Sequence, residues 1–373
     1  MGSRVGISVA VCILLAVGSA SAALAGWTAT NLSPAGCLAS YAYGVYAGHQ
    51  VGYCYGAEAT GGQNHSSRWR GTPAFEDLNV GGLATSCATG IHGDETVGYA
   101  NGTLTGGADH ASLWTGTPVR WVDLNPVGSS TSHAQGTSGG QHVGWASGQI
   151  TQNAVHALLW RGSAADYVDL NPSGYLVSRA YDNSGAVQVG CAQAAGQSAH
   201  AGLWTGSADS WIDLNPLGCT NSIAYGIDGD TQVGSANGDI TGNLSHACTW
   251  RGAKGSWLDL NPTGCLASVA YAISGANQAG YAYGSATGNQ QHAGIWRGTK
   301  GSWIDLHTAL PAGYNASQAY GIETVGNTIY VVGYATNAAA HVNEAFMWTY
   351  VPEPSCLIAL LAGLGLLGLR RRR

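Results

Sequence analysis

The chain has 373 residues, of which 9% are charged, and it contains 57 Gly, 13 Trp and 18 Tyr beside only 2 Phe and 2 Met. An ordinary soluble domain is about 25% charged, yet between the two termini no apolar run approaches the roughly 18–20 residues of a membrane-spanning helix. The high content of Gly, Trp and Tyr and the low content of charged residues indicate a repetitive β structure with a polar, uncharged surface. The formal net charge is −6, so the basic footprint required for nucleic-acid binding is missing.

Residues 1–25 have the three parts of a secretory signal peptide. Arg4 supplies the positive charge, Val9–Val17 supplies the apolar stretch, and small residues before Ala22 or Ala25 form a cleavage site. The apolar stretch is short for a retained anchor helix. We therefore predict export of the protein and removal of this segment.

Residues 26–350 contain a repeat of about 46 residues that occurs seven times. An Asp-Leu-Asn-Pro motif or a degraded form of it begins at Asn31, Asp77, Asp123, Asp169, Asp213, Asp259 and Asp305. A His-Ala-x-x-Trp motif begins at His65, His110, His156, His200, His246 and His292, and Glu344 replaces the histidine of the seventh copy. A Val-Gly-Tyr motif has its glycine at Gly52, Gly98, Gly144, Gly190, Gly234, Gly280 and Gly333.

Each repeat contains four short stretches without helical periodicity, separated by turn residues. In the fifth copy the stretches are Ser222–Ile227, Thr231–Ala236, His246–Trp250 and Trp257–Leu260. Clusters of Gly, Asn and Asp between them are typical of hairpin turns. Four strands and four turns of this size make one blade of a propeller. The sequence therefore predicts an all-β protein, a seven-bladed β-propeller.

The phase of the repeat predicts how the ring closes. The mature chain begins with the last strand of a repeat, Trp27–Leu32, and its final repeat ends with the third strand, Ala345–Trp348. We expect the N-terminal strand to become the outermost strand of the seventh blade. A linear stack would need polar capping repeats at both ends, and the sequence contains none.

The His-Ala registers resemble the HAF family of extracellular repeats, with Ala345-Phe346-Met347-Trp348 as the closest match to its His-Ala-Phe element. The resemblance covers roughly residues 27–349. It implies a repeat architecture in an extracellular setting and brings no known activity with it.

The repeated histidines and aspartates are interpreted as architecture. Catalysis needs a histidine at one place with a positioned partner, whereas copies spread around a ring do not converge. By analogy with the blades of WD-repeat propellers, we expect these histidines to contact the repeated Asp or the repeated Ser of the first strand. No catalytic motif occurs, so we predict no enzymatic activity, no metal and no cofactor. The residues assigned to this structural role are His65, His110, His156, His200, His246, His292, Asp77, Asp123, Asp169, Asp213, Asp259 and Asp305.

The tryptophans of the repeat are expected to pack between blades. Trp145 stands apart, because other copies have Tyr, Cys or Ser at its position, and it is the better candidate for stacking on a sugar. Seven cysteines remain after both terminal segments are removed. Those at equivalent positions, such as Cys37 and Cys219, are expected to lie too far apart for a disulfide, and the pairing is otherwise open.

A function confined to one place must depart from the sevenfold symmetry. The fourth repeat has Arg179 and Asp182 in a stretch where other copies have x-Ala-Tyr-Gly-Ile, and the seventh has an enlarged first hairpin that begins at Glu323. Both a functional site and sequence drift remain open as explanations. Clustering of such departures at one mouth of the ring would favour a site.

The C-terminus contains Pro352, Glu353 and Pro354, then the apolar run Cys356–Leu369, and finally the cluster Arg370, Arg371, Arg372 and Arg373. Fourteen helical residues span about 21 Å, which is short for a hydrocarbon core, and the arginines favour the cytoplasmic side. This order of features resembles the PEP-CTERM sorting signal of Gram-negative bacteria. The resemblance implies that an exosortase-type enzyme recognises Pro-Glu-Pro and removes the tail. An ordinary tail anchor is the alternative.

These observations predict an exported propeller that is held at the membrane by its tail before processing and then resides at the cell surface or in the extracellular matrix. We expect a non-catalytic structural or binding module. The alternatives are a lectin-like binder of exopolysaccharide and a glycan-active enzyme with its site at the channel mouth, which would need two carboxylates about 5–10 Å apart. The ligand and the face that binds it are not determined by the sequence.

Overall fold

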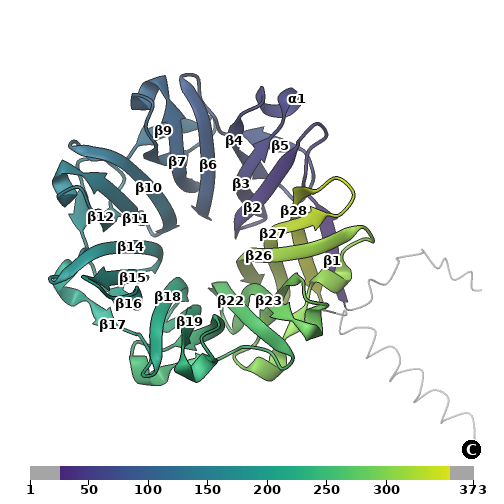
Figure 1. Cartoon of the computed structure of the whole chain (residues 1–373). Helices are drawn as coiled ribbons and strands as arrows, with labels where there is room; N and C mark the ends of the chain where they lie inside the picture. The colour runs from purple at the N-terminus through teal and green to yellow at the C-terminus, as the bar shows by residue number, and fades with distance from the viewer. Residues whose placement is uncertain (1–25, 353–373) are drawn as a thin grey trace, which may run out of the picture. The chain divides into compact units, whose positions relative to one another are not determined.

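A computed structural model describes residues 26–352. The predicted signal peptide (1–25) and the residues from Glu353 to Arg373 lie outside this range, so of the predicted sorting element only Pro352 is included. The described chain forms seven four-stranded antiparallel sheets, which are arranged as blades around a central axis (Figure 1). The prediction of a seven-bladed β-propeller is confirmed.

Blades one to six follow the repeat, and each takes its four strands in chain order from the axis outward. Blade one contains β2 (Ala39–Tyr46), β3 (His49–Tyr55), β4 (Asn64–Trp69) and β5 (Phe75–Asp77). Blade two contains β6 (Leu83–His92), β7 (Glu95–Gly102), β8 (His110–Thr115) and β9 (Arg120–Asp123). Blade three contains β10 (Ser129–Ser138), β11 (Gln141–Gly148), β12 (Val155–Trp160) and β13 (Tyr167–Asp169). Blade four contains β14 (Tyr175–Ser184), β15 (Val187–Ala194), β16 (His200–Trp204) and β17 (Ile212–Asp213). Blade five contains β18 (Cys219–Asp228), β19 (Thr231–Gly238), β20 (His246–Trp250) and β21 (Leu258–Asp259). Blade six contains β22 (Cys265–Ser274), β23 (Asn277–Gly284), β24 (Gln291–Trp296) and β25 (Ile304–Asp305).

Blade seven joins the two ends of the propeller. It contains β26 (Tyr314–Val325), β27 (Thr328–Asn337), β28 (Val342–Val351) and, as its outermost strand, β1 (Gly26–Asn31). The backbone N–H of Leu32 donates to the carbonyl oxygen of Ala345 at 2.8 Å. The predicted closure by the N-terminal strand is therefore confirmed.

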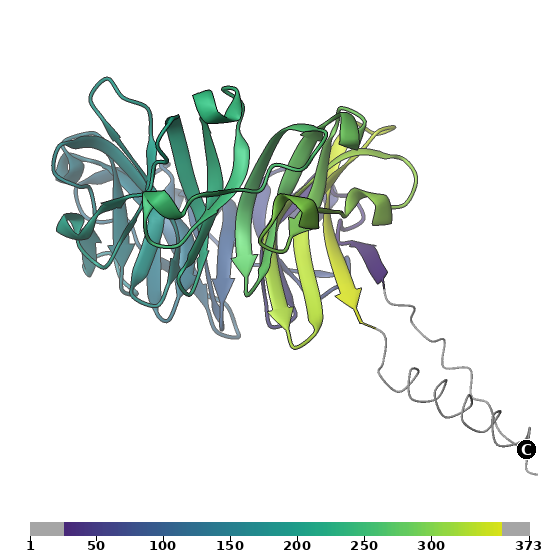
Figure 2. The ribbon, with the colours of Figure 1, turned by 90° about the horizontal axis from the view of Figure 1, so that it is seen from below.

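The helical segments are single turns in the links between strands. They are α1 (Ala57–Thr60), η1 (Thr103–Thr105), η2 (Gln149–Thr151), η3 (Ala208–Ser210), η4 (Asp239–Thr241), η5 (Lys254–Ser256), η6 (Ser285–Thr287), η7 (Lys300–Ser302) and η8 (His307–Ala309). Within residues 26–352, none of them has the length and hydropathy that a membrane crossing requires. The strands run between two faces of the ring (Figure 2).

The core lies between adjacent blades and is built from the repeat motifs. The repeated tryptophan of each third strand is at most 1% exposed, in Trp69, Trp114, Trp160, Trp204, Trp250, Trp296 and Trp348. The leucine of each Asp-Leu-Asn-Pro motif is equally buried, in Leu32, Leu78, Leu124, Leu170, Leu214, Leu260 and Leu306. Because a single blade exposes two sheet faces, these side chains lose contact with water only when the neighbouring blade covers them.

The glycine of the Val-Gly-Tyr motif allows the first two strands of a blade to approach closely. A Cβ atom on Gly52 would overlap the carbonyl oxygen of Tyr41, and one on Gly144 would overlap that of His133. No other residue can be placed there without moving the backbone. This requirement explains why the glycine is present in all seven repeats.

A β-bulge interrupts the first strand of every blade. In blade one the register shifts between Ala42 and Gly44, which leaves Tyr43 unpaired. A bulge adds one residue to a strand and redirects its side chain. The bulge residues are Tyr43, Thr89, Gln135, Tyr181, Tyr225, Tyr271 and Tyr320, and all of them line the central channel.

Candidate functional site at the channel mouth

The seven bulge residues form an uneven ring across the channel. Five of them are tyrosines in consecutive edge or tilted contact, with ring centroids 5.2 Å apart for Tyr181–Tyr225, 5.1 Å for Tyr225–Tyr271, 4.8 Å for Tyr271–Tyr320 and 5.1 Å for Tyr320–Tyr43. Burial raises the pKa of Tyr225 to about 12 and raises the pKa values of the other four tyrosines further. Their hydroxyl groups are therefore neutral and able both to donate and to accept hydrogen bonds.

The ring separates two cavities. The larger has a volume of about 420 Å³ and is lined by the ring together with Cys87, Tyr99 and His133. The smaller, of about 200 Å³, is lined by the ring and by the residues that follow the bulges, such as Gly44, Gly90 and Asp182. The larger cavity lies on the side of the ring where the inner strands begin, because Cys87 and His133, which line it, precede the bulge residues on those strands. It extends toward blades two and three, where Thr89 and Gln135 take the place of tyrosines in the ring.

Four side chains from three blades form one continuous stack, and two of them, Tyr99 and His133, line the larger cavity. His133 lies between Tyr99, at 3.9 Å between ring centroids, and Trp145, at 4.4 Å. The guanidinium carbon of Arg179 lies 5.9 Å from the Trp145 ring, within the range of a cation–π contact. All four side chains are half-buried. Trp145 and Arg179, which the sequence singled out as departures from the repeat, are thus brought together.

His133 is a functional candidate that the sequence analysis missed. Burial lowers its pKa, although Asp109 partly opposes this effect, and its Nε2 lies 3.2 Å from Asp109 Oδ2. The residues at its position in the other blades are Tyr41, Cys87, Arg179, Ile223, Val269 and Gln318. This variation in the sequence indicates that the position has no shared structural role in the blades. Only the folded structure shows that His133 faces the channel.

Asp182 lies directly after the ring residue Tyr181 and lines the smaller cavity. Its Oδ1 accepts a hydrogen bond from the backbone N–H of Asn183 at 2.8 Å, and its Oδ2 accepts one from Ile227 of the next blade at 3.0 Å. Asp182 therefore borders the smaller cavity, while the protein surrounds the rest of its half-buried side chain. Burial raises its pKa to about 7, even though both backbone N–H groups favour the charged form.

The raised pKa of Asp182 predicts a pH dependence of stability. The unfolded chain releases this proton near pH 4 and the folded chain near pH 7, so the free energy of unfolding should fall as the pH rises through that window. The slope from one group is at most about 1.4 kcal/mol per pH unit. In Asp182→Gly, which restores the residue of most other blades, urea unfolding at pH 5 and pH 7.5 should show a smaller difference. Asp230→Gly in an exposed turn is the control, and an unchanged slope in Asp182→Gly would contradict the assignment.

The face around the larger cavity carries exposed apolar side chains. Val127 and Leu217, in the Asn-Pro turns that precede inner strands, are 96% and 94% exposed. Further exposed residues on the same face occupy the starts of inner strands and the links between second and third strands, and they are Leu38, Leu104, Leu176, Ile240, Leu244 and Leu266. An apolar surface beside a cavity is typical of a binding face.

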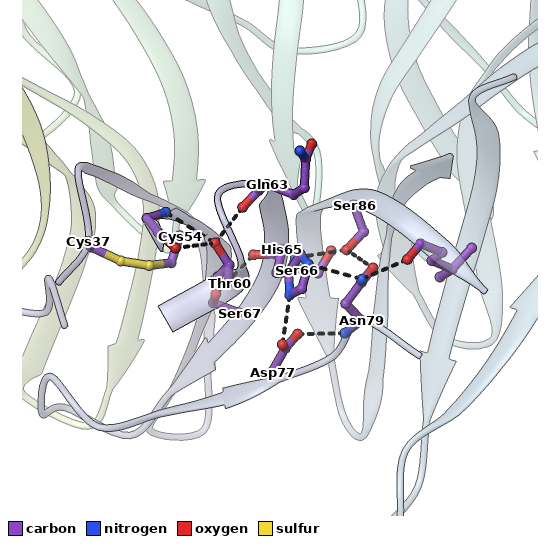
Figure 3. A network of polar contacts seen from close by, with 12 residues as sticks. Cys37, Cys54, Thr60, Gln63, His65, Ser66, Ser67, Asp77, Asn79 and Ser86 are labelled. Carbon is purple, nitrogen blue, oxygen red and sulfur yellow. Dashed lines mark hydrogen bonds and ion pairs between the residues drawn. A yellow bond between two sulfur atoms is a disulfide. The ribbon is translucent and has the colours of Figure 1, made fainter. Parts of the chain in front are cut away.

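The repeated histidines and aspartates lie in the outer half of each blade, on the third and fourth strands. In each of the six pairs, histidine Nδ1 lies 2.7–3.1 Å from aspartate Oδ2. In blade one, Asp77 Oδ1 also accepts a hydrogen bond from the backbone N–H of Asn79, whose side chain contacts Ser86 of blade two (Figure 3). The pairs are therefore linked to a tether between neighbouring blades and do not converge on the channel.

Blade seven replaces this pair with a different set of partners. Glu344 stands at the histidine position and accepts hydrogen bonds from Asn31 at 2.6 Å and from the Tyr314 hydroxyl at 2.5 Å. Asn31 stands at the aspartate position. In blade seven the acidic residue is on the third strand, whereas in the other blades it is on the fourth. A polar link between the third and fourth strands is kept. Glu323 accepts a hydrogen bond from the backbone of Ala47 and joins blade seven to blade one.

Cys37 and Cys54 form a disulfide between the start of blade one and its second strand (Figure 3). The five other cysteines of residues 26–352 are free, and Cys87, which lines the larger cavity, is among them. No cluster of metal-ligating side chains occurs in the described part of the chain. Among the described residues that line the two cavities, Asp182 alone is acidic.

No protein-family model matches this sequence, and no curated protein matches it. Solved structures do share its fold. Puromycin hydrolase superposes with a TM-score of 0.54 at 11% identity, over 85% of this chain and 56% of that protein. A puromycin-hydrolyzing peptidase of Mycobacterium tuberculosis gives 0.51 at 12% identity, over 85% and 55%. The β-propeller domain of the Trilobed protease from Pyrococcus furiosus, which has an open velcro topology, gives 0.52 at 8% identity, over 83% and 95%.

These comparisons correct one prediction. The expectation that the protein is not an enzyme is wrong on this evidence, because puromycin hydrolase and the mycobacterial peptidase are enzymes whose structures contain such a propeller. The lack of a catalytic sequence motif therefore does not exclude activity. This chain spans little more than half of either enzyme, and at 11–12% identity the likeness establishes the propeller fold alone.

Proposed function

We propose that this protein is an exported surface or matrix propeller that binds a saccharide at the mouth of its larger channel cavity. The observation that carries the proposal is the stack of Tyr99, His133, Trp145 and Arg179. Trp145 departs from the repeat, and His133 and Arg179 occupy a register that varies among the blades. They come from three different strands and meet beside Tyr99, which lines the larger cavity together with His133. Drift of the sequence would scatter such departures around the ring.

The chemistry of the cavity suits a sugar. Aromatic faces carry partial negative charge and attract the C–H groups on the apolar face of a pyranose ring. The neutral tyrosine hydroxyls and the Gln135 amide offer donors and acceptors for sugar hydroxyls. A largely aromatic cavity with a few convergent polar groups is the usual form of a small-ligand site, and about 420 Å³ would accommodate one or two sugar units.

A glycan array probed with a chain that ends at Tyr350 tests the proposal. We expect retention of one class of saccharide by the parent chain, and an at least tenfold weaker affinity for Trp145→Ala, about 1.4 kcal/mol. His133→Ala should weaken binding similarly because it removes the support of the Trp145 ring. Tyr281→Ala, at the same register in blade six, is the matched control and should bind normally. Absence of any retained saccharide, or equal losses in Trp145→Ala and Tyr281→Ala, would refute the proposal.

The proposed location rests on the two terminal segments. The signal peptide at residues 1–25 would direct export, and an exosortase-type enzyme would act on the tail that begins with Pro352, Glu353 and Pro354 and ends with Arg370–Arg373. Removal of 351–373 should release folded propeller into the soluble fraction, because the apolar run is the segment that would hold the chain at a membrane. Cell fractionation of full-length and truncated chains measures this effect. A truncated protein that sediments with membranes as firmly as the full chain would contradict the sorting assignment.

A further inference from the structure

Arg179 is the charged member of the stack and has no ionic partner in the described chain. Two other arginines of residues 26–352 do form ion pairs, Arg68 with Glu76 and Arg161 with Asp166. No carboxylate in residues 26–352 lies within ion-pair distance of Arg179. Its side chain is half-buried. A guanidinium group that has lost part of its hydration without gaining a carboxylate partner is well suited to bind an anion, to which its N–H groups donate hydrogen bonds.

The position of Arg179 directs it to the proposed binding site. On β14 it precedes the ring residue Tyr181 by two positions, as His133 precedes Gln135 on β10, and His133 lines the larger cavity. The charge of Arg179 lowers the pKa values of both Tyr181 and Cys191, although burial dominates at each group and raises them. The arginine is thus electrostatically coupled to a residue of the ring.

The acidic groups nearby do not neutralise this site. Asp109 contacts His133 and also accepts a hydrogen bond from Asn101 at 3.3 Å, and in the stack the rings of His133 and Trp145 stand between it and Arg179. Asp182 lies on the other side of the tyrosine ring, in the smaller cavity. The chain as a whole has a net charge of −6, so an unpaired arginine at an aromatic mouth is a local exception.

We infer that the saccharide bound at this mouth is acidic, and that Arg179 pairs with its negative group while the aromatic side chains of the mouth contact its ring. The inference rests on the proposed function and makes it more specific. The planar guanidinium accommodates a carboxylate or a sulfate with two parallel hydrogen bonds. The cation–π contact with Trp145 restricts the movement of the Arg179 side chain before binding, which lowers the entropy lost on binding.

Paired probes that differ only in charge test the inference. One pair is oligogalacturonate and its methyl ester, which cover carboxylate recognition, and the other is dextran sulfate and dextran, which cover sulfate recognition. In titrations with the chain ending at Tyr350, the acidic member of at least one pair should bind at least tenfold more tightly than its neutral partner. In Arg179→Gln this preference should disappear, and in Arg179→Lys it should be reduced. Arg161→Gln, which changes the net charge equally at an exposed ion pair, should keep the full preference.

The outcomes separate this inference from the proposed function. Equal or tighter binding of the neutral partners, binding of neither acidic probe, or equal losses in Arg179→Gln and Arg161→Gln would overturn the acidic-saccharide inference. The proposed function would survive the first two results if the glycan array retained a neutral saccharide that depends on Trp145. Failure of every saccharide on the array would refute both.

Discussion

Deletion of Gly26–Leu32 should destabilise the propeller more than any other change of similar size. This segment contains β1, which pairs with β28 as the outer strand of blade seven. Its last residue, Leu32, is fully buried beside Trp69, Val332 and Ala345. Loss of a buried leucine alone costs about 2–5 kcal/mol, and a typical native domain is stable by only about 5–15 kcal/mol.

The deletion also has a consequence beyond lost packing. It uncovers the edge of β28, and an open strand edge invites pairing with another chain. We therefore expect a large fall in the urea midpoint or complete failure to fold, together with aggregation visible in size-exclusion chromatography. The matched control is the chain that ends at Tyr350, which should unfold like the parent. A deletion variant that melts like this control would show that ring closure does not depend on β1.

Replacement of the repeated histidine or its aspartate should lower stability by amounts that do not add. In blade three, His156 Nδ1 lies 2.7 Å from Asp169 Oδ2, and the His156 side chain is largely buried. His156→Ala should cost about 1–3 kcal/mol, because it leaves a hydrogen-bonding partner unsatisfied. Asp169→Ala should cost more, since Asp169 Oδ1 also accepts the backbone N–H of Asn171 at 2.8 Å. The double variant should lose less than the sum, because either single change already removes the contact.

Thermal and urea unfolding of these variants, with and without a chelator, measures the effect. His246→Ala in blade five is the matched comparison, because its Nδ1 contacts Asp259 in the same register at 3.1 Å. A structural role predicts similar losses in both blades and no chelator effect. Strictly additive losses at His156 and Asp169, or a large chelator shift, would argue against that role.

The sequence alone determined the architecture of this protein. Three motifs recur with one spacing, and each encodes local chemistry: a glycine where two strands touch, a tryptophan and a leucine that need a covering blade, and an Asn-Pro turn before the next inner strand. Because turn residues and the alternation of side chains act over a few positions, they specified the strands, the number of blades and the closure by β1.

The candidate site was decided by the tertiary structure. A bulge in each inner strand shifts the alternation of side chains by one residue, so Tyr43 and its counterparts face the channel rather than the core, and no motif in the sequence marks that shift. The sequence could single out Trp145 and Arg179 as departures from the repeat, but it could not place them beside Tyr99 and His133. Those four residues lie on β7, β10, β11 and β14, which are first or second strands of blades two, three and four, and they meet only because these blades lie side by side around a common axis.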